Sequence, residues 1–323
     1  MARVLCITLN PALDLAFDLD TLVPGAVNRS QRAHLEAAGK GVNVARVLAG
    51  LGHDVSVSGF LGADNDAPFR RAFEQLGVRD GFVRVPGETR INAKLAEASG
   101  RVTDINGPGI AISSDTLAAF KRQTNEALEG SDAPDAVLIA GSLPPGMALA
   151  DFSALLKRLK ARHVPLWVDT SGEALRAAID IAPAALKPNE VELSDWAGKT
   201  LDSHAKRLDA VNRLHQAGVA NAMLSAGADG VLWASQMGVW QASPPRVEAV
   251  NTVCAGDTFV AGMLHGQLMG HSPETTLRFA TALSAEAVRH VGVGDPNAPD
   301  FTQLLHATHL QRLDAESAKG TTP

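Results

Sequence analysis

The stretch that best indicates the fold is Ala37-Ala-Gly-Lys-Gly-Val-Asn-Val-Ala-Arg-Val-Leu-Ala-Gly-Leu-Gly-His-Asp-Val-Ser-Val-Ser-Gly-Phe60. After a glycine-containing turn, apolar residues recur at helical spacing up to a natural helix stop at Gly52. The apolar run that follows, Val55–Phe60, is typical of a buried strand. A helix next to a buried strand predicts one crossover unit of a parallel β-sheet.

The same alternation continues along most of the chain. Short apolar runs bounded by Gly, Pro, Asn or Asp predict buried strands at Val4–Leu9, Ala136–Ala140, Leu166–Val168, Ala185–Leu186 and Ala222–Leu224. Helices are expected over 113–129, 151–162 and 202–217, and from Phe259 to about Met269. Strands joined by crossover helices predict a doubly wound α/β sheet.

Two regions predict strands without helices between them. Leu13–Asp20 alternates apolar and polar residues, which is the period of a half-buried strand. Three more strands are predicted at Phe82–Val85, Thr89–Glu97 and Val102–Asn106. We expect these segments, within about 12–35 and 82–107, to form a small antiparallel lid on a single domain spanning 1–312. Residues 313–323 are expected to be a flexible tail.

Composition excludes several classes of protein. The 323 residues include 29 Lys+Arg and 35 Asp+Glu, a net charge of −6. An acidic chain without a long Lys/Arg run lacks the basic face expected of a nucleic-acid-binding protein, and the absence of tyrosine leaves few aromatic side chains on which bases could stack. No apolar stretch reaches a membrane-spanning length, and the short apolar run after Met1 predicts no signal peptide. Two cysteines, Cys6 and Cys254, form no disulfide framework, so a reducing cytoplasm is expected.

The segment Asn251-Thr-Val-Cys-Ala-Gly-Asp-Thr-Phe-Val-Ala-Gly262 carries the strongest chemical signal. Its small residues, Ala255 and Gly256, lead directly into a predicted helix, and the free amides at a helix N-terminus bind anions. Asp257 stands at the same place. Its carboxylate either caps the helix or acts as a general base beside a bound phosphate.

A second glycine-containing turn, Gly39-Lys-Gly41, also opens a helix. It does not have the spacing of a Walker A loop, and Gly198-Lys-Thr200 fails the same test because position 193 is Leu. A simple turn explains Gly39-Lys-Gly41 as well as a phosphate site does.

On the strand predicted at Thr89–Glu97, Arg90, Asn92 and Lys94 share one face. That face either grips a sugar phosphate or is simply solvated.

Two more segments follow predicted strands, at the edge where open α/β sheets place ligands. In Lys187-Pro-Asn-Glu-Val-Glu192, Asn189 and Glu192 are oxygen donors suited to Mg²⁺, although ordinary helix-start chemistry explains them nearly as well. Ser225-Ala-Gly-Ala-Asp-Gly230 has the composition of a turn that could pass beneath a nucleotide.

Taken together and in this order, the segments resemble the PfkB (ribokinase-like) carbohydrate kinase family. Ala38–Ala45 is similar to its first signature and Thr252–Thr258 to its second, and the similarity extends from Ile7 to about Gly294. The resemblance implies a three-layer α/β/α sandwich with a mostly parallel sheet, a β lid, and ATP-dependent phosphorylation of a phosphosugar. Within the family, the segments most resemble bacterial enzymes that convert fructose 1-phosphate to fructose 1,6-bisphosphate. Tagatose 6-phosphate and fructose 6-phosphate are the alternative substrates.

The resemblance also implies a role for each matching residue. Asp257 is implied as the base, with an anion hole formed by the Ala255 and Gly256 amides next to Cys254. The implied ATP site contains Lys187, Ser225, Gly227 and Gly230. Asn189 and Glu192 are implied to hold Mg²⁺ through water, and Asn251 and Val253 to hold K⁺. The sugar phosphate is expected among Asp14, Gly39, Lys40, Asn43, Arg90, Asn92, Lys94 and Ser142. Pairing of two lids in a homodimer is expected as well.

Cys254 departs from the family pattern, which usually has glycine at this place. Cysteine is strained there if the position needs a positive φ, and is a small filler if it does not. A helix N-terminus can lower the pKa of a thiol, so we expect Cys254 to be sensitive to alkylation and protected by ATP.

Two other classes of protein fit the sequence less well. A non-catalytic sugar-phosphate sensor on the same fold is expected to have lost the base, and Asp257 is present. A nicotinamide-dependent oxidoreductase needs a G-x-G-x-x-G turn early in the chain, whereas Gly292-Val-Gly294 comes late and lacks the third glycine.

Overall fold

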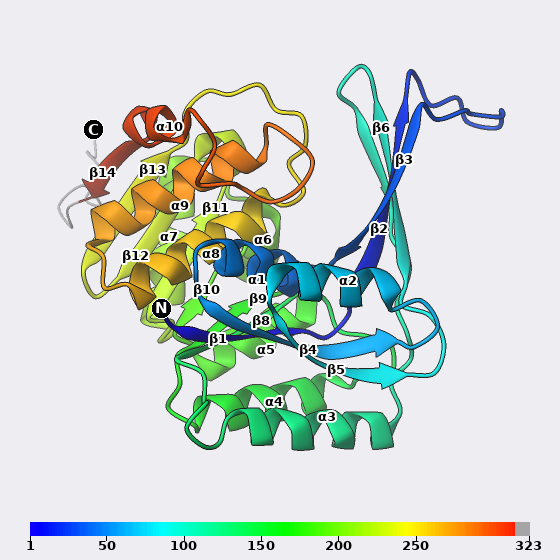
Figure 1. The fold of residues 1–323 in the computed structure, drawn as a ribbon. Helices are drawn as coiled ribbons and strands as arrows, with labels where there is room; N and C mark the ends of the chain where they lie inside the picture. Colours follow the sequence, from blue (N-terminus) through cyan, green and yellow to red (C-terminus); the bar gives the residue numbers. More distant parts are fainter. Residues whose placement is uncertain (314–323) are drawn as a thin grey trace.

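A ten-stranded sheet forms the centre of the protein in the computed structural model, which describes residues 1–313 (Figure 1). Its strands lie in the order β14 (His309–Leu313), β13 (Gly238–Ser243), β12 (Val231–Ser235), β11 (Asn221–Ser225), β10 (Ala185–Leu186), β9 (Leu166–Asp169), β8 (Ala136–Ala140), β1 (Arg3–Thr8), β4 (Asp54–Gly62) and β5 (Arg79–Val85). Neighbours from β5 to β11 are parallel, and those from β11 to β14 are antiparallel. The expected mostly parallel sheet is confirmed.

Helices cover both faces of this sheet. One group contains α1 (Lys40–Gly50), α2 (Ala67–Leu76), α8 (Ala255–Leu268), α9 (Pro273–Ala287) and α10 (Phe301–Ala307). The other contains α3 (Ser114–Ala127), α4 (Leu149–Lys160), α5 (Gly172–Ile181), α6 (Glu190–Ala197) and α7 (His204–Gln216). Side chains of β1 alternate between the two resulting cores, with Val4 and Cys6 in the first and Leu5 and Ile7 in the second. This arrangement is a three-layer α/β/α sandwich.

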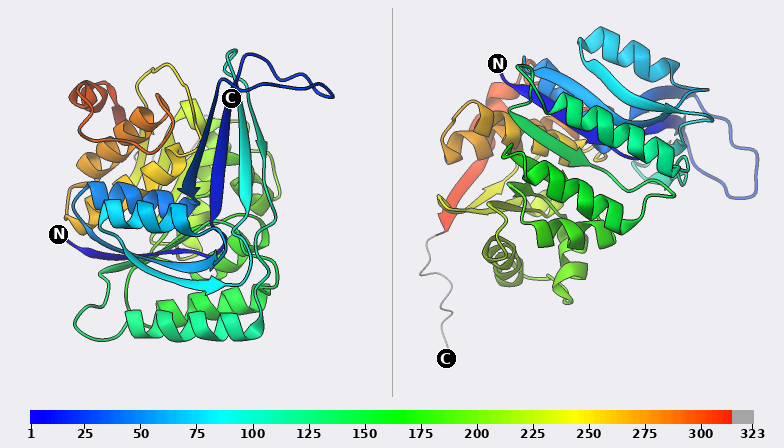
Figure 2. Two further views of the ribbon diagram at one scale, coloured as in Figure 1. Left: turned by 45° about the vertical axis from the view of Figure 1, so that its right-hand side comes forward. Right: turned by 90° about the horizontal axis from the view of Figure 1, so that it is seen from below.

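The lid is a separate four-stranded sheet that stands away from the sandwich (Figures 1 and 2). Its strands lie in the order β3 (Arg32–Ala38), β2 (Ala12–Leu19), β6 (Ile91–Glu97) and β7 (Val102–Ile105). The expectation of an antiparallel lid is wrong at its centre, because β2 and β6 pair in parallel. These two strands come from distant parts of the sequence, so no hairpin sets their direction.

The segment Phe82–Val85 was expected in the lid, and this expectation is wrong. It belongs to β5, which pairs in parallel with β4 at the edge of the main sheet. The helix α2, which the sequence reasoning missed, supplies the crossover between these two strands. Phe73 of α2 stacks on Phe82 of β5, with ring centroids 5.8 Å apart.

The end of the described chain is part of the sheet, because Leu313 pairs with Val239 of β13. The rest of the expected tail, 314–323, lies outside the described residues. Within 1–313, no helix has both the length and the apolar character needed to cross a membrane.

Candidate active site

Asp257 lies in the first turn of α8 and is almost completely buried. The side-chain amide of Asn43, on α1, donates a hydrogen bond of 2.8 Å to its carboxylate. Burial raises the pKa of Asp257 to about 7, against the charges of Lys40 and Lys187, which lower it. A carboxylate with a pKa near neutrality can accept and release a proton under physiological conditions.

Two lysines flank a second buried carboxylate, Asp169, at the carboxyl end of β9. The Lys40 ammonium is 3.1 Å from one Asp169 oxygen, and the Lys187 ammonium is 3.7 Å from the other. Burial works to raise the pKa of Asp169, but the charges of Lys187 and Lys40 hold it below its usual value. The result is two fixed positive charges close to Asp257.

The start of α8 faces one of these charges. A β-carbon placed on Gly256 would lie 3.5 Å from the Lys187 ammonium nitrogen. Within 1–313, the Ala255 amide donates to the Thr252 carbonyl oxygen at 3.3 Å, whereas helix geometry leaves the Gly256 amide without an intrahelical acceptor. The helix dipole adds positive potential there. The Ala255–Gly256 backbone and Lys187 therefore form one electropositive spot, which suits a transferring phosphoryl group.

The turn before α1 has the geometry predicted for it. Gly39 is the N-cap residue, and its φ of 120° is a conformation that side-chain-bearing residues rarely adopt. The turn places Lys40 at the first position of α1 and Asn43 one turn later, so both side chains reach the start of α8.

A polar cluster lies on the lid strands β2 and β6. Asn92 donates a hydrogen bond of 3.1 Å to Asp14, and the Lys94 ammonium is 3.3 Å from the same carboxylate. Burial raises the pKa of Asp14, while the charge of Lys94 works to lower it. The predicted shared face is thus confirmed for Asn92 and Lys94, which converge on Asp14.

Arg90 precedes β6, and its guanidinium is directed at the main chain. It donates to the carbonyl oxygens of Asn10, Gly107 and Pro11, at 2.8, 3.0 and 3.2 Å. The Asn10 side chain in turn donates to the Ser142 hydroxyl at 3.2 Å. Arg90 therefore fixes the junction between the lid and the sandwich, with two of its five N–H groups left for other acceptors.

The segments predicted for the nucleotide side lie next to each other. Asn189 and Ser225 form a parallel bridge at the ends of β10 and β11. Asn189 and Glu192 form a capping box, each accepting the other's backbone amide, which is the helix-start chemistry that the sequence also allowed. Gly230 closes the turn of the 3₁₀ helix η1 (Gly227–Asp229), where a β-carbon would come within 2.0 Å of the Ala242 carbonyl oxygen.

The segment predicted to hold a monovalent cation forms a tight turn. The Asn251 side chain accepts the Val253 amide at 2.9 Å, and the Asn251 amide donates to the Val288 carbonyl at 3.0 Å. Within 1–313, the structure has no group of three or more His, Cys, Asp or Glu side chains arranged to hold a metal ion.

A family model for the pfkB family of carbohydrate kinases matches residues 7–300. The chain belongs to this family. It is 44% identical over 311 residues to a 1-phosphofructokinase of Vibrio cholerae, covering 96% of this chain and 97% of that protein. It is 42% identical to a 1-phosphofructokinase of Escherichia coli K12, covering 96% and 98%. The resemblance inferred from the sequence motifs is thereby confirmed.

Solved structures support the same assignment. Phosphofructokinase-2 from Escherichia coli, in complex with fructose-6-phosphate, superimposes with a TM-score of 0.85 at 28% identity, covering 95% of this chain and 99% of that one. A ribokinase from Thermotoga maritima matches with a TM-score of 0.71 at 21% identity, covering 94% and 100%, which shows the shared fold. This pfkB-family chain therefore has the expected ribokinase-like sandwich with a separate lid.

Cys254 replaces the usual family glycine without backbone strain, because its φ is −90°. The interpretation of this residue as a small filler is therefore confirmed. The expected lowering of its thiol pKa is wrong. Burial, together with the negative charge of Asp257, raises the pKa of Cys254 to about 12.

Asp169 is the site residue that sequence reasoning missed. A signal was present, since a carboxylate directly after the apolar run Leu166–Val168 stands at the ligand-binding edge of the sheet. A single Asp after a strand is too common a pattern to stand out. Only its ion pairs with Lys40 and Lys187 identify it.

Proposed function

We propose that this carbohydrate kinase transfers the γ-phosphoryl group of ATP to the C6 hydroxyl of fructose 1-phosphate, giving fructose 1,6-bisphosphate and ADP. The observation that carries the proposal is the buried Asp257 carboxylate at the start of α8, with a pKa of about 7. The relatives named 1-phosphofructokinase, which align over nearly their whole length, support the choice of substrate.

In this mechanism Asp257 accepts the proton of the C6 hydroxyl as that oxygen attacks the γ-phosphorus. The new O–P bond forms while the bond from the γ-phosphorus to the β,γ-bridging oxygen breaks, which releases ADP. Asn43 orients the carboxylate. The first-turn amides of Ala255 and Gly256, with Lys187, stabilise the charge on the transferring group.

The residues on the nucleotide side fit a magnesium ion bound through water. Glu192 uses one carboxylate oxygen in the capping box, and within the described residues the other accepts no hydrogen bond and suits a hydrated ion. Within 1–313, the Asp169 oxygen that has no hydrogen-bond partner lies 3.7 Å from the Lys187 ammonium, which compensates its charge. Mg²⁺ bound through water at Asn189 and Glu192 would neutralise phosphate charge on ATP, and K⁺ is proposed at Asn251 and Val253. Ser225, Gly227 and Gly230 are proposed to lie against the nucleotide.

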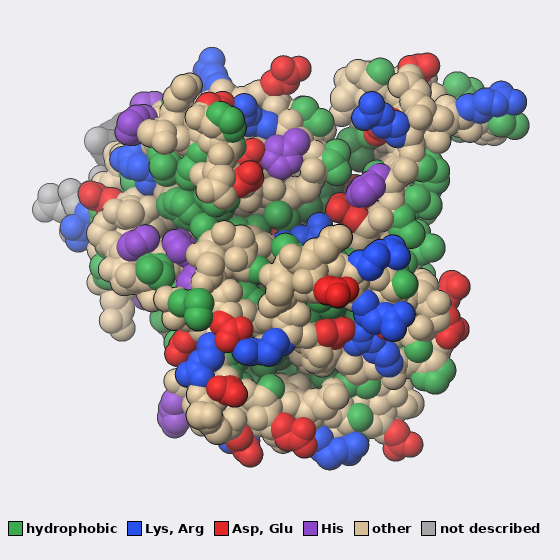
Figure 3. Space-filling view, in the orientation of Figure 1, with side chains coloured by type: hydrophobic (Ala, Val, Ile, Leu, Met, Phe, Trp, Pro, Cys, Tyr) green, Lys and Arg blue, Asp and Glu red, His purple; other side chains and the backbone are tan. Residues whose placement is uncertain are grey.

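The sugar phosphate is proposed to lie between the lid and the sandwich, where Figure 3 shows a hollow. Asp14 and Asn43, with the Gly39 backbone, suit the sugar hydroxyls. The charged side chains of Arg90 and Lys94 and the hydroxyl of Ser142 suit the C1 phosphate. Asn92 holds Asp14 in place through a hydrogen bond. Lys40, whose charge lowers the pKa of Asp257, is proposed to lie beside the reacting groups.

A homodimer joined through the lid is also proposed. Leu35, Leu15, Ala93 and Ile105 stand opposite one another across all four lid strands and so share one face. Leu35 and Ile105 are exposed. An apolar sheet face of this width is costly in water, and a second lid would cover it. Light scattering should give a dimer for the protein and a monomer for the double variant Leu35→Asp/Ile105→Asp.

A coupled ADP-release assay tests the proposed reaction. Fructose 1-phosphate, fructose 6-phosphate and tagatose 6-phosphate are each titrated at saturating ATP and Mg²⁺. The highest kcat/KM is expected for fructose 1-phosphate. A higher value for another sugar would move the assignment to another kinase of the family, and no ADP release above background with any sugar would favour a non-catalytic sensor.

A further inference from the structure

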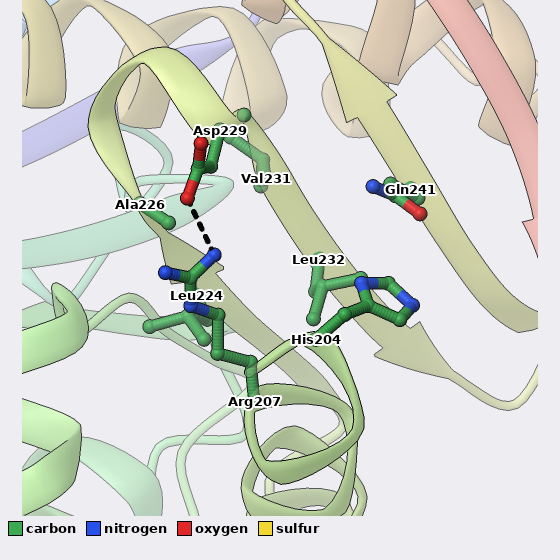
Figure 4. Close-up of a pocket in the computed structure, with 9 residues that line it drawn as sticks. His204, Arg207, Leu224, Ala226, Asp229, Val231, Leu232 and Gln241 are labelled. Carbon is green, nitrogen blue, oxygen red and sulfur yellow. Dashed lines mark hydrogen bonds and ion pairs between the residues drawn. The ribbon is translucent and has the colours of Figure 1, made fainter. Parts of the chain in front are cut away.

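Arg207 connects two turns that lie on the nucleotide side of the protein. It belongs to the first part of α7, and its side chain is only 18% exposed. Figure 4 shows its guanidinium directed at Asp229, the last residue of η1. The hydrogen bond between them is 2.7 Å long. A second nitrogen of the same group is 2.8 Å from the carboxylate of Glu190, the first residue of α6.

A third contact fixes the plane of the guanidinium. The Arg207 Nε donates to the Leu201 carbonyl oxygen at 3.1 Å. All three contacts are made by one planar group. Ordering this single side chain costs conformational entropy once, and that cost is shared among several hydrogen bonds. The space around the group is small, with a cavity volume of about 10 Å³, too little for a ligand. The contacts therefore form a structural tie.

The two carboxylates that Arg207 holds are adjacent to the residues assigned to ATP and Mg²⁺. Asp229 directly precedes Gly230, and Glu190 directly follows Asn189, within the capping box that contains Glu192. The two turns already meet at the bridge between Asn189 and Ser225. The β11–β12 pairing holds the ends of the η1 turn, and Arg207 adds a side-chain link from α7 between this turn and the start of α6.

We propose that Arg207 is a positioning residue for the nucleotide site, which sets the distance between the η1 turn and the start of α6. The proposal rests on the proposed ATP-dependent function. Arg207 does not touch the reacting atoms, so it acts on nucleotide affinity and leaves the binding of the sugar phosphate unchanged.

The test measures binding of a non-hydrolysable ATP analogue with Mg²⁺ by isothermal titration calorimetry. Arg207→Lys keeps the charge but cannot reach both carboxylates, and Arg207→Met removes the tie. We expect Kd to rise about fivefold in the first variant and about tenfold in the second, with KM for the sugar phosphate within about twofold of wild type. Lys206→Met is the matched control, because Lys206 is on the same turn and, among residues 1–313, its ammonium pairs with the exposed Asp202 alone, at 2.8 Å.

Each outcome decides a different point. Wild-type affinity in Arg207→Lys, together with weak binding in Arg207→Met, would mean that charge alone matters and would overturn the positioning role. Unchanged affinity in both variants would overturn it as well, as would a matching rise in the sugar-phosphate KM. If the wild-type protein itself does not bind the analogue, the proposed function fails. Arg207→Lys conserves the positive charge, so it keeps the test valid if Arg207→Met does not fold.

Discussion

The side-chain amide of Asn43 donates a 2.8 Å hydrogen bond to the carboxylate of Asp257, a residue 214 positions later in the chain. This contact joins the first turns of α1 and α8, which pack against each other. Lys40, the first residue of α1, pairs with the buried Asp169, and the charge of Asp169 also acts on Asp257 in the first turn of α8. The starts of α1 and α8 and the two lysines thus surround the Asp257 carboxylate. This arrangement is suited to moving a proton next to a phosphoryl group.

Replacing Asp257 with Asn should lower kcat by at least about 10², because an amide cannot accept the proton of the attacking hydroxyl. The Asn43 contact and the size of the side chain are kept, so affinity for the ATP analogue should change less than about twofold. Steady-state kinetics and calorimetry measure the two quantities. Asp115→Asn is the control, since Asp115 lies in the first turn of α3 but is exposed. A kcat near wild type in Asp257→Asn would remove this residue from the mechanism.

The dependence of kcat/KM on pH should show an acid limb near pH 7, because the free enzyme needs Asp257 deprotonated. The charge of Lys40 lowers the pKa of Asp257 and that of Asp169 raises it. Lys40→Met should therefore move the limb to higher pH, and Asp169→Asn should move it to lower pH. The position of the limb is the readout, since both variants also lose activity. Shifts in the same direction would contradict this account of the site.

Much of the fold could be predicted because the pattern that specifies it is local. The helix and strand within 37–60 show their apolar periods in a single window, and α1 and β4 form where they were expected. Pairing between distant segments leaves no such pattern. The sequence did not predict that β2 pairs in parallel with β6, because these strands are far apart in the chain. It also did not place β5 in the main sheet, because the crossover helix α2 that leads to β5 was missed.

The residues of the candidate site also differ in how far the local sequence predicts them. Asp257, Lys40 and Asn43 stand in short motifs that each allow a simpler explanation but together resemble the family signatures, and the structure brings these residues together. The carbonyl acceptors of Arg90 come from three separate backbone positions, so its role at the lid junction depends on the folded geometry. The ion pairs of Asp169 also form only when α1 and β9 have packed.

Cys254 should react slowly with iodoacetamide at pH 7.5. Burial and the charge of Asp257 raise the pKa of its thiol to about 12, so almost none of the reactive thiolate is present. Mass spectrometry should find less than about a tenth of Cys254 modified under conditions that fully alkylate the protein in urea. Cys6 is the internal control, because it is completely buried and its pKa is raised as well. Rapid modification of Cys254 that ATP prevents would restore the expectation from the sequence.

The stability of the protein should fall as the pH drops from about 6.5 toward 4, partly because of His265 on α8. Its ring nitrogen is 2.8 Å from that of His53, and burial lowers the pKa of His265 to about 4. Between about pH 6.5 and 4, His265 binds a proton in the unfolded chain but not in the folded protein. The contribution of His265 to the free energy of unfolding is therefore complete above this pH range and is lost as the pH falls through it. We expect a loss of about 1 kcal/mol from this residue, because the ring is only half-buried and solvent screens the effect.

Urea unfolding at pH 7.5 and pH 5.0 measures this contribution. His265→Asn removes the titrating ring and retains an amide near His53, so its free energy of unfolding should change less between the two pH values than that of wild type. The lower stability of the variant at pH 7.5, expected from the smaller side chain, does not affect this difference. His306→Asn, at an exposed position of α10, should keep the wild-type difference. Equal pH dependence in His265→Asn and wild type would show that His265 does not contribute to acid stability.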